Sequence, residues 1–275
     1  MTALDAIFLG IIQGLTEFLP VSSSGHLLLA QHLLGMRDLD RYILFDLACH
    51  LGTLLAIVLV FFRNIRQVFE GNRIRLWQVI IGTLPLFPLV LLMKPIKAAY
   101  ADPAYLGFFF MLTALILFIG IRFGKTLPET LQEKQALVTP LDKDMIKSEK
   151  HPWRDALAIG IWQAAAILPG VSRSGSTISG AKILGWDSRE AVVFSFLLAI
   201  PAILGGTTLE LFKLWQEPER TISLSISHYT IGFIISFAVG LFALQLLIKL
   251  TVQNKFYYFA WYCLILGFVT TYYFR

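Results

Sequence analysis

The chain has 275 residues, of which 56% are hydrophobic and 15% are charged. Soluble domains average about 45–50% apolar and about 25% charged residues, so this composition excludes an ordinary soluble enzyme and a disordered chain. The net charge is +5, but the basic residues form no stripe of the kind that binds nucleic acid. Cys49 and Cys263 lie in apolar runs that match no disulfide or zinc pattern. We therefore expect a polytopic membrane protein with membrane lipids around it and no nucleic-acid partner.

Each half of the chain begins with an apolar region that a polar turn interrupts. The region 4–34 contains Pro-Val-Ser-Ser-Ser-Gly, and the region 153–184 contains Pro-Gly-Val-Ser-Arg-Ser-Gly-Ser-Thr. Irregular backbone at membrane depth is tolerated where it lines a cavity, so both regions predict re-entrant helical hairpins. A spanning helix needs about 20 apolar residues. Six stretches predict such spans: 42–62, 76–93 and 104–123 after the first hairpin, and 191–212, 229–250 and 257–274 after the second.

The two hairpins resemble each other. Gly10-Ile-Ile-Gln13 aligns with Gly160-Ile-Trp-Gln163, and Val21-Ser-Ser-Ser-Gly25 aligns with Val171-Ser-Arg-Ser-Gly175, both at an offset of 150 residues. Each half consists of one re-entrant hairpin and three spans, and because three is odd the second half enters the membrane in the opposite orientation. We therefore expect an all-α inverted repeat with halves 1–123 and 153–275 and a cytoplasmic connector at 124–152. The alternative is chance similarity between Ser- and Gly-rich turns.

The basic residues predict the orientation in the membrane. Fifteen of the 23 Lys and Arg residues fall on one predicted face, seven fall on the other, and Arg173 lies within the second hairpin. The face with more basic residues is expected to be cytoplasmic. Both termini are then expected to be periplasmic.

Two charged residues, Glu17 and Arg173, lie beside the hairpin turns. A charge at the bilayer centre costs roughly 2.5–3.5 kcal/mol on insertion scales and usually marks a functional site. Arg173 and the helix N-termini after the turns suit phosphate. Gln13 and Glu17 are four residues apart and could hold a hard cation through oxygen, while His26 could act as nucleophile or base. These features together predict metal-assisted phosphoryl transfer.

Each feature also has a structural alternative. Glu17 and Arg173 could simply neutralise each other, the serines could stabilise the turns, and His26 could cap a helix. Asp46 and His50, four residues apart within a span, are interpreted as a structural pair.

Gln13-Gly-Leu-Thr-Glu17 resembles the (Glu/Gln)-x-x-x-Glu motif of bacterial undecaprenyl-diphosphate phosphatases of the bacitracin-resistance type. Pro169-Gly-Val-Ser-Arg-Ser-Gly-Ser-Thr177 matches the same family's Pro-Gly-x-Ser-Arg-Ser-x-x-Thr motif, and Phe18-Leu-Pro-Val-Ser-Ser-Ser-Gly-His26 also looks like that family's segment. The resemblance covers essentially the whole chain.

The resemblance implies a phosphatase of the bacterial cytoplasmic membrane that converts undecaprenyl diphosphate to undecaprenyl phosphate and recycles the lipid carrier for cell-wall synthesis. It implies bacitracin resistance, a site opening to the periplasm and a divalent cation, Mg²⁺ or Ca²⁺, on Glu17 and Gln13. Some members carry an acid where this chain has Gln13, which weakens the metal assignment. The implied catalytic residues are Glu17, His26 and Arg173, and the implied substrate-binding residues are Gln13, Ser23, Gly170, Ser172, Arg173, Ser174 and Thr177.

Two other functions compete with this one. Inverted repeats with broken helices also occur in transporters, so a flippase for undecaprenyl phosphate is the main alternative; a flippase needs a cationic site but no nucleophile such as His26. The phosphatidic-acid-phosphatase superfamily is disfavoured because the chain has no Arg-Pro dipeptide. The nucleophile could be His26, Ser23 or water, and a homo-oligomer is compatible with the sequence.

Overall fold

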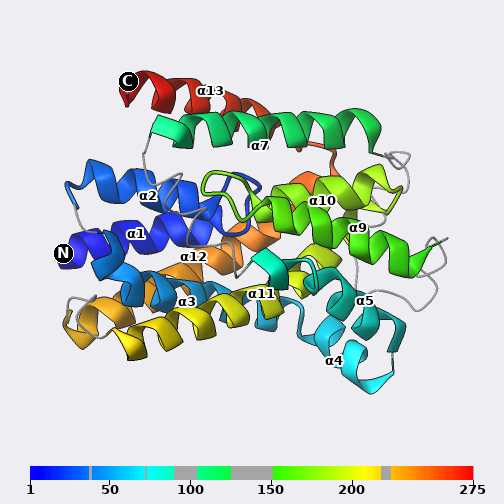
Figure 1. Cartoon of the computed structure of the whole chain (residues 1–275), viewed down its shortest axis with the longest axis horizontal. Helices are drawn as coiled ribbons and strands as arrows, with labels where there is room; N and C mark the ends of the chain where they lie inside the picture. Colours follow the sequence, from blue (N-terminus) through cyan, green and yellow to red (C-terminus); the bar gives the residue numbers. More distant parts are fainter. Residues whose placement is uncertain (37–38, 72, 90–103, 125–150, 218–223, 275) are drawn as a thin grey trace.

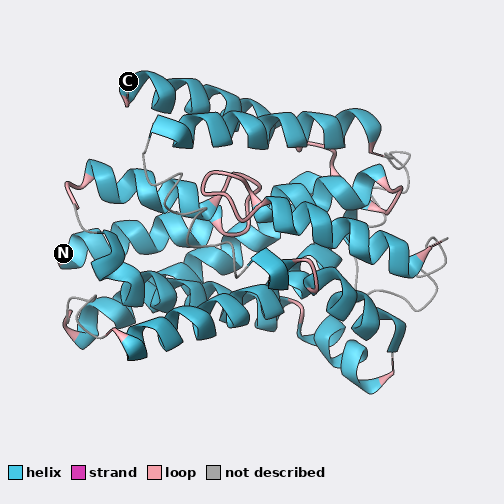
Figure 2. Cartoon of the chain, viewed as in Figure 1, coloured by secondary structure: helices cyan, strands magenta, loops and turns pink. Residues whose placement is uncertain are grey.

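The computed structural model describes residues 1–36, 39–71, 73–89, 104–124, 151–217 and 224–274. All regular structure in these residues is helical, which confirms the predicted all-α class (Figure 2). The first half contains α1 (Ala3–Thr16), α2 (Ser23–Leu33), the 3-10 helix η1 (Leu39–Tyr42), α3 (Ile43–Val60), α4 (Phe62–Glu70), α5 (Arg73–Thr83) and α7 (Ala104–Phe123). The second half contains α9 (Pro152–Ala165), α10 (Arg173–Ile183), α11 (Ser188–Gln216), α12 (Ile226–Val252) and α13 (Tyr257–Tyr273).

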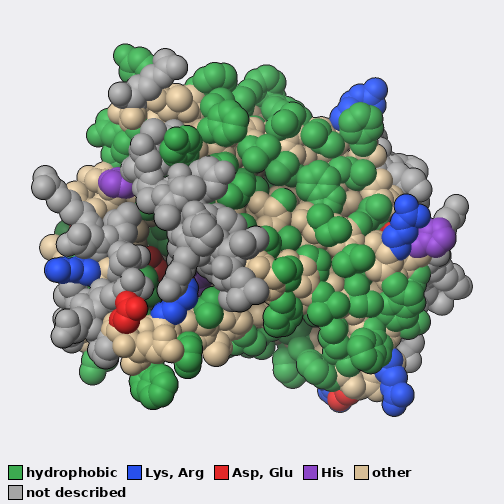
Figure 3. All heavy atoms as spheres, viewed as in Figure 1, with side chains coloured by type: hydrophobic (Ala, Val, Ile, Leu, Met, Phe, Trp, Pro, Cys, Tyr) green, Lys and Arg blue, Asp and Glu red, His purple; other side chains and the backbone are tan. Residues whose placement is uncertain are grey.

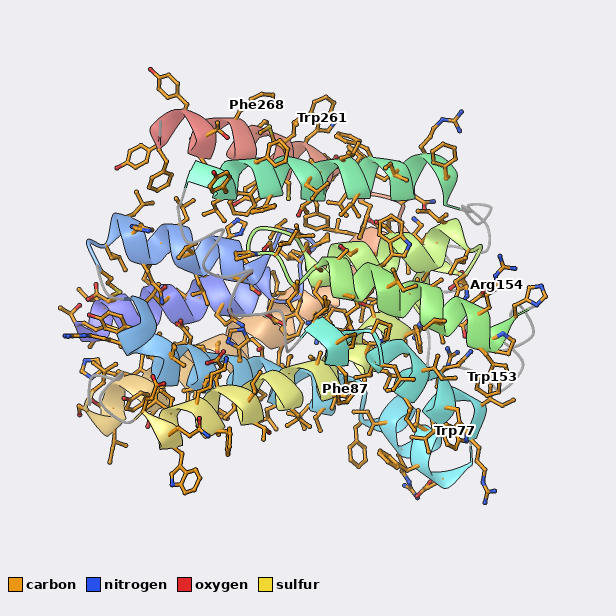
Figure 4. All side chains as sticks on the ribbon, in the orientation of Figure 1. Trp77, Phe87, Trp153, Arg154, Trp261 and Phe268 are labelled. Atoms are coloured by element: carbon orange, nitrogen blue, oxygen red, sulfur yellow. The ribbon has the colours of Figure 1, made fainter. Side chains whose placement is uncertain are left out.

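Several helices are suited to a membrane. Among the described residues, four helices are long and apolar enough to cross one, namely α3, α7 from Tyr105, α11 and α12. Hydrophobic side chains cover most of the face in Figure 3, and basic side chains lie mainly towards its two ends. Trp261 and Phe268 of α13 are more than half exposed and point away from the bundle (Figure 4). The chain is a multi-pass membrane protein.

The two predicted hairpins are helix–turn–helix units that enter the molecule from opposite ends. The helices α1 and α2 occupy one end, α9 and α10 occupy the other, and the two turns meet in the middle (Figure 1). Both termini lie at the end occupied by α1 and α2 (Figure 1).

The turns end in matched helix caps. Ser22 caps α2 by accepting a hydrogen bond from the Gly25 amide, and Ser172 caps α10 by accepting one from the Gly175 amide. A serine at this position satisfies an amide that the helix itself leaves unpaired. The same bond therefore recurs at the offset of 150 residues that the sequence shows.

Helices from the two halves pack against one another. The most extensive packing is between α7 and α13, α3 and α12, α1 and α12, and α5 and α9. Where α7 meets α13, a Cβ atom on Gly107 would lie 2.5 Å from the Gly267 carbonyl oxygen, so the backbones touch at this point. Small residues permit such close approach between membrane helices.

The predicted span 76–93 differs from the structure. Helix α5 ends at Thr83, and a turn follows at Leu84 and Pro85. Proline lacks an amide hydrogen and disfavours helical geometry at the preceding residue, which explains the break. The separate short helix α4 was not predicted. Residues 90–93 and most of the predicted connector, 125–150, lie outside the described residues.

Candidate active site

The two hairpin turns meet through a buried ion pair. Arg173 Nη2 lies 2.7 Å from Glu17 Oε1, and the side chains are 17% and 6% exposed. The other carboxylate oxygen, Oε2, accepts hydrogen bonds from Ser23 Oγ at 2.7 Å and from Gln13 Nε2 at 3.1 Å. Glu17 therefore has donors from α1, α2 and α10, which offset the cost of burying its charge.

Arg173 is held from the opposite side by α11. Its Nη1 donates to the Ser195 carbonyl at 3.4 Å, and its guanidinium carbon lies 5.9 Å from the centre of the Phe196 ring. The Phe196 ring in turn contacts Phe18 edge-to-face at 5.6 Å. A guanidinium has five N–H donors, so Arg173 can keep both contacts and still bind phosphate oxygens.

A small polar cavity lies between the turns. Its volume is about 60 Å³, and its lining is Thr16, Glu17, Ser22–Ser24, Ala166 and Val171–Ser174. The first turns of α2 and α10 both border it. The N-terminus of a helix presents unpaired amides and a partial positive charge, which favour phosphate. This cavity has the chemistry of an anion site with one carboxylate at its wall.

A second cavity of about 390 Å³ opens beside the first. Helices α3 and α11 form its walls, and apolar side chains such as Ile43, Leu47 and Ile203 contribute most of the surface that faces the cavity. Glu17 and Ser23 border both cavities. An apolar groove therefore leads to the same carboxylate that contacts Arg173.

The structure brings six of the predicted site residues together: Gln13, Glu17, Ser23, Ser172, Arg173 and Ser174. It places two others outside the cavity lining. Gly170 has a φ of 97° and its carbonyl accepts a hydrogen bond from Thr113 at 2.8 Å, while Thr177 bonds to Ser195 Oγ at 2.6 Å. Both residues shape the turn and its helix.

His26 also lies outside both cavities. Its Nδ1 is 2.7 Å from the Ser22 carbonyl, and its Nε2 is 2.8 Å from the Tyr262 hydroxyl. The ring stacks on Tyr262 and meets Phe110 edge-to-face. In this arrangement both ring nitrogens have partners away from Glu17.

The oxygen atoms of Gln13 and Glu17 supply part of what a divalent cation needs as ligands. Gln13 is fully buried, and its Oε1 has no hydrogen-bond partner. This orphaned acceptor lies on the same helix face as the Glu17 carboxylate, and Mg²⁺ characteristically binds one or two carboxylates together with substrate phosphates. In the described part of the chain, no three His, Cys, Asp or Glu side chains form a metal-binding group. The protein alone therefore offers Gln13 and Glu17, and phosphate oxygens would complete the coordination.

Comparison with known proteins identifies the family. The model of the family described as bacitracin resistance protein BacA matches residues 6–269. The chain belongs to this family. A protein of Protochlamydia amoebophila named undecaprenyl-diphosphatase is 49% identical over 276 residues, which is 100% of both chains. Proteins of the same name from Carboxydothermus hydrogenoformans and Christiangramia forsetii are each 36% identical over 97% of this chain and 95% and 96% of their own.

Three residues of this BacA family member were not predicted at the site. Thr113 accepts a hydrogen bond from the Ser172 amide at 3.0 Å, and Ser195 contacts both Arg173 and Thr177. His50 borders the larger cavity, with Nε2 3.9 Å from Glu17 Oε2. The sequence gives no signal for Thr113 and Ser195 because they lie in long apolar helices. The sequence does contain a signal for His50, which is its spacing of four residues from Asp46, but that spacing is interpreted as a structural pair.

Proposed function

We propose that this chain hydrolyses the terminal phosphate from undecaprenyl diphosphate, giving undecaprenyl phosphate and inorganic phosphate. The observation that carries this proposal is the meeting of Arg173, Glu17 and two serine-capped helix N-termini around one buried cavity. The relatives described above share the name undecaprenyl-diphosphatase. The flippase alternative has no comparable support.

The proposed site residues have different roles in binding the substrate and a cation. Arg173 and the amides at the start of α10 would bind the diphosphate oxygens and offset the charge that develops during transfer. The isoprenoid chain would lie in the apolar groove between α3 and α11, which ends at Glu17. Gln13 and Glu17 would hold Mg²⁺ or Ca²⁺, and such a cation would supply further neutralisation of phosphoryl oxygens. His26 stays a predicted nucleophile or base. Its ring would have to break the hydrogen bond to Tyr262 and turn towards the cavity to act in this way.

We also propose the inverted repeat and a periplasmic position for both termini. The matched caps of Ser22 and Ser172 and the opposed hairpins support the repeat. The end of the molecule opposite the termini carries α4 and the first turn of α9, with exposed arginines Arg63, Arg66 and Arg154 (Figures 1 and 4). This end would face the cytoplasm of a bacterial cell. A homo-oligomer stays a prediction.

The test is phosphate release by the full chain in detergent from undecaprenyl diphosphate, with Mg²⁺, Ca²⁺ or EDTA. Wild type is expected to release phosphate and Arg173→Ala is expected to lose at least about 10³-fold in kcat/KM, as for other arginines that neutralise a transferring phosphoryl group. Phe268→Leu, on the outer side of α13, is the matched control with wild-type activity. Folded wild type that releases no phosphate with either cation would refute the proposal.

A further inference from the structure

Asp46 and His50 on α3 form a network that the proposed reaction has not used. Gln31 Nε2 donates to both Asp46 carboxylate oxygens, at 3.0 and 3.2 Å. His50 Nδ1 lies 2.7 Å from the Asp46 carbonyl oxygen. Asp46 and His50 both border the larger cavity together with Glu17 and Ser23. These polar groups therefore lie in the wall of the groove beside Glu17.

The hydrogen bonds fix what His50 presents to Glu17. A carbonyl oxygen only accepts, so Nδ1 is the donor in that bond, and in the neutral ring Nε2 is then an acceptor. Nε2 lies 3.9 Å from Glu17 Oε2, which is beyond hydrogen-bond distance, and a carboxylate is also an acceptor. Two acceptors at this separation fit a small group that donates two hydrogens. Water is such a group, and it can bridge polar atoms more than about 3.5 Å apart.

We propose that His50 and Glu17 together hold the water molecule that attacks the terminal phosphorus. This inference rests on the proposed phosphatase function. The water oxygen bonds to that phosphorus while the bond to the bridging oxygen breaks. The bridging oxygen leaves with undecaprenyl phosphate, and both water hydrogens leave in dihydrogen phosphate. His50 is thus a positioning residue that acts through the water, and the backbone carbonyl of Asp46 holds its ring.

The competition between water and methanol tests this assignment. Full-length protein in detergent hydrolyses undecaprenyl diphosphate in aqueous methanol, and inorganic phosphate and methyl phosphate are both measured. In methyl phosphate formation, the methanol oxygen replaces the water oxygen and the same bridging bond breaks. A misplacement of a reacting group by about 1 Å can lower the rate by about 10²-fold. His50→Leu should lower kcat by about that factor, leave KM within about threefold, and raise the ratio of methyl phosphate to phosphate.

His50→Gln is the conservative variant, because an amide oxygen can accept the same hydrogen bond from water. It should keep kcat within about tenfold of wild type and keep the product ratio unchanged. Phe268→Leu, on the outer side of α13 and away from both cavities, is the control for the ratio. The thermal midpoints of all variants are measured in parallel, and the Gln variant remains informative if the Leu variant does not fold.

The outcomes separate the two proposals. A folded wild type that releases no phosphate refutes the phosphatase function itself. An active wild type together with a His50→Leu variant of unchanged kcat and product ratio overturns only the water-positioning proposal. Recovery of the Leu variant by additional Mg²⁺ would also overturn it, because His50 would then be a metal ligand.

Discussion

The ion pair between Glu17 and Arg173 gives a quantitative test of how the two hairpins hold together. At the observed 2.7 Å and an effective dielectric constant of about 20, two unit charges attract by about 6 kcal/mol. Desolvation offsets much of this attraction, but removing one partner of a buried pair typically costs about 3–5 kcal/mol because the other charge stays buried. In a protein of roughly this size, each kcal/mol lowers the thermal midpoint by about 2–4 °C.

We therefore expect Arg173→Met to lower the thermal midpoint by roughly 10 °C, since Glu17 then loses its charged partner and, among the described side chains, keeps Gln13 and Ser23 as hydrogen-bond donors. Glu17→Gln/Arg173→Met removes both charges and should be less destabilised than Arg173→Met alone. The assay is thermal unfolding of the purified full chain in detergent, followed by tryptophan fluorescence, for wild type, both single variants and the double variant. A double variant whose shift equals the sum of the single shifts would show that the pair is not coupled and would refute the reasoning.

Two further predictions concern packing and metal binding. Gly107→Ala should lower the thermal midpoint by roughly 3–10 °C, because overpacking costs about 1–3 kcal/mol and the new Cβ meets the Gly267 backbone. The control is Gly205→Ala in α11, where the new Cβ meets nothing within 4 Å, so the thermal midpoint should not fall. Equal changes of the thermal midpoint in the two variants would contradict the close contact between α7 and α13. Gln13→Glu would place a second carboxylate beside Glu17 and should reduce the Mg²⁺ concentration for half-maximal phosphate release by about tenfold, as a Mg²⁺ titration after EDTA treatment can measure; an unchanged titration would remove Gln13 from the metal site.

Much of the architecture follows from local chemistry. Polar turns within the apolar regions 4–34 and 153–184 indicated two broken helices, and the structure has helix–turn–helix units there. Serine caps at a constant offset are visible in the sequence because capping depends only on neighbouring residues. The juxtaposition of Glu17 and Arg173 could also be predicted, since burying either charge alone is costly.

The rest depends on packing between distant segments. Whether an imidazole faces the cavity or a neighbouring helix depends on the rotation of that helix. His26 contacts Tyr262, which is 236 residues away, whereas His50 borders the cavity with Glu17. Neither outcome can be read from spacing within one helix. The end of α5 at Thr83 did have a local signal in Pro85, but prolines within membrane helices are often tolerated.

The close contact between α7 and α13 has a consequence for biosynthesis. Helix α7 leaves the ribosome long before α13, which comprises Tyr257–Tyr273 near the end of the chain. Helix α1 likewise packs on α12, which is also made late. Helices α1 and α7 are thus made before the helices that pack on them, and the Gly107 face of α7 stays uncovered until α13 is inserted. A chain cut short before α13 would leave this face of α7 without the helix that packs on it.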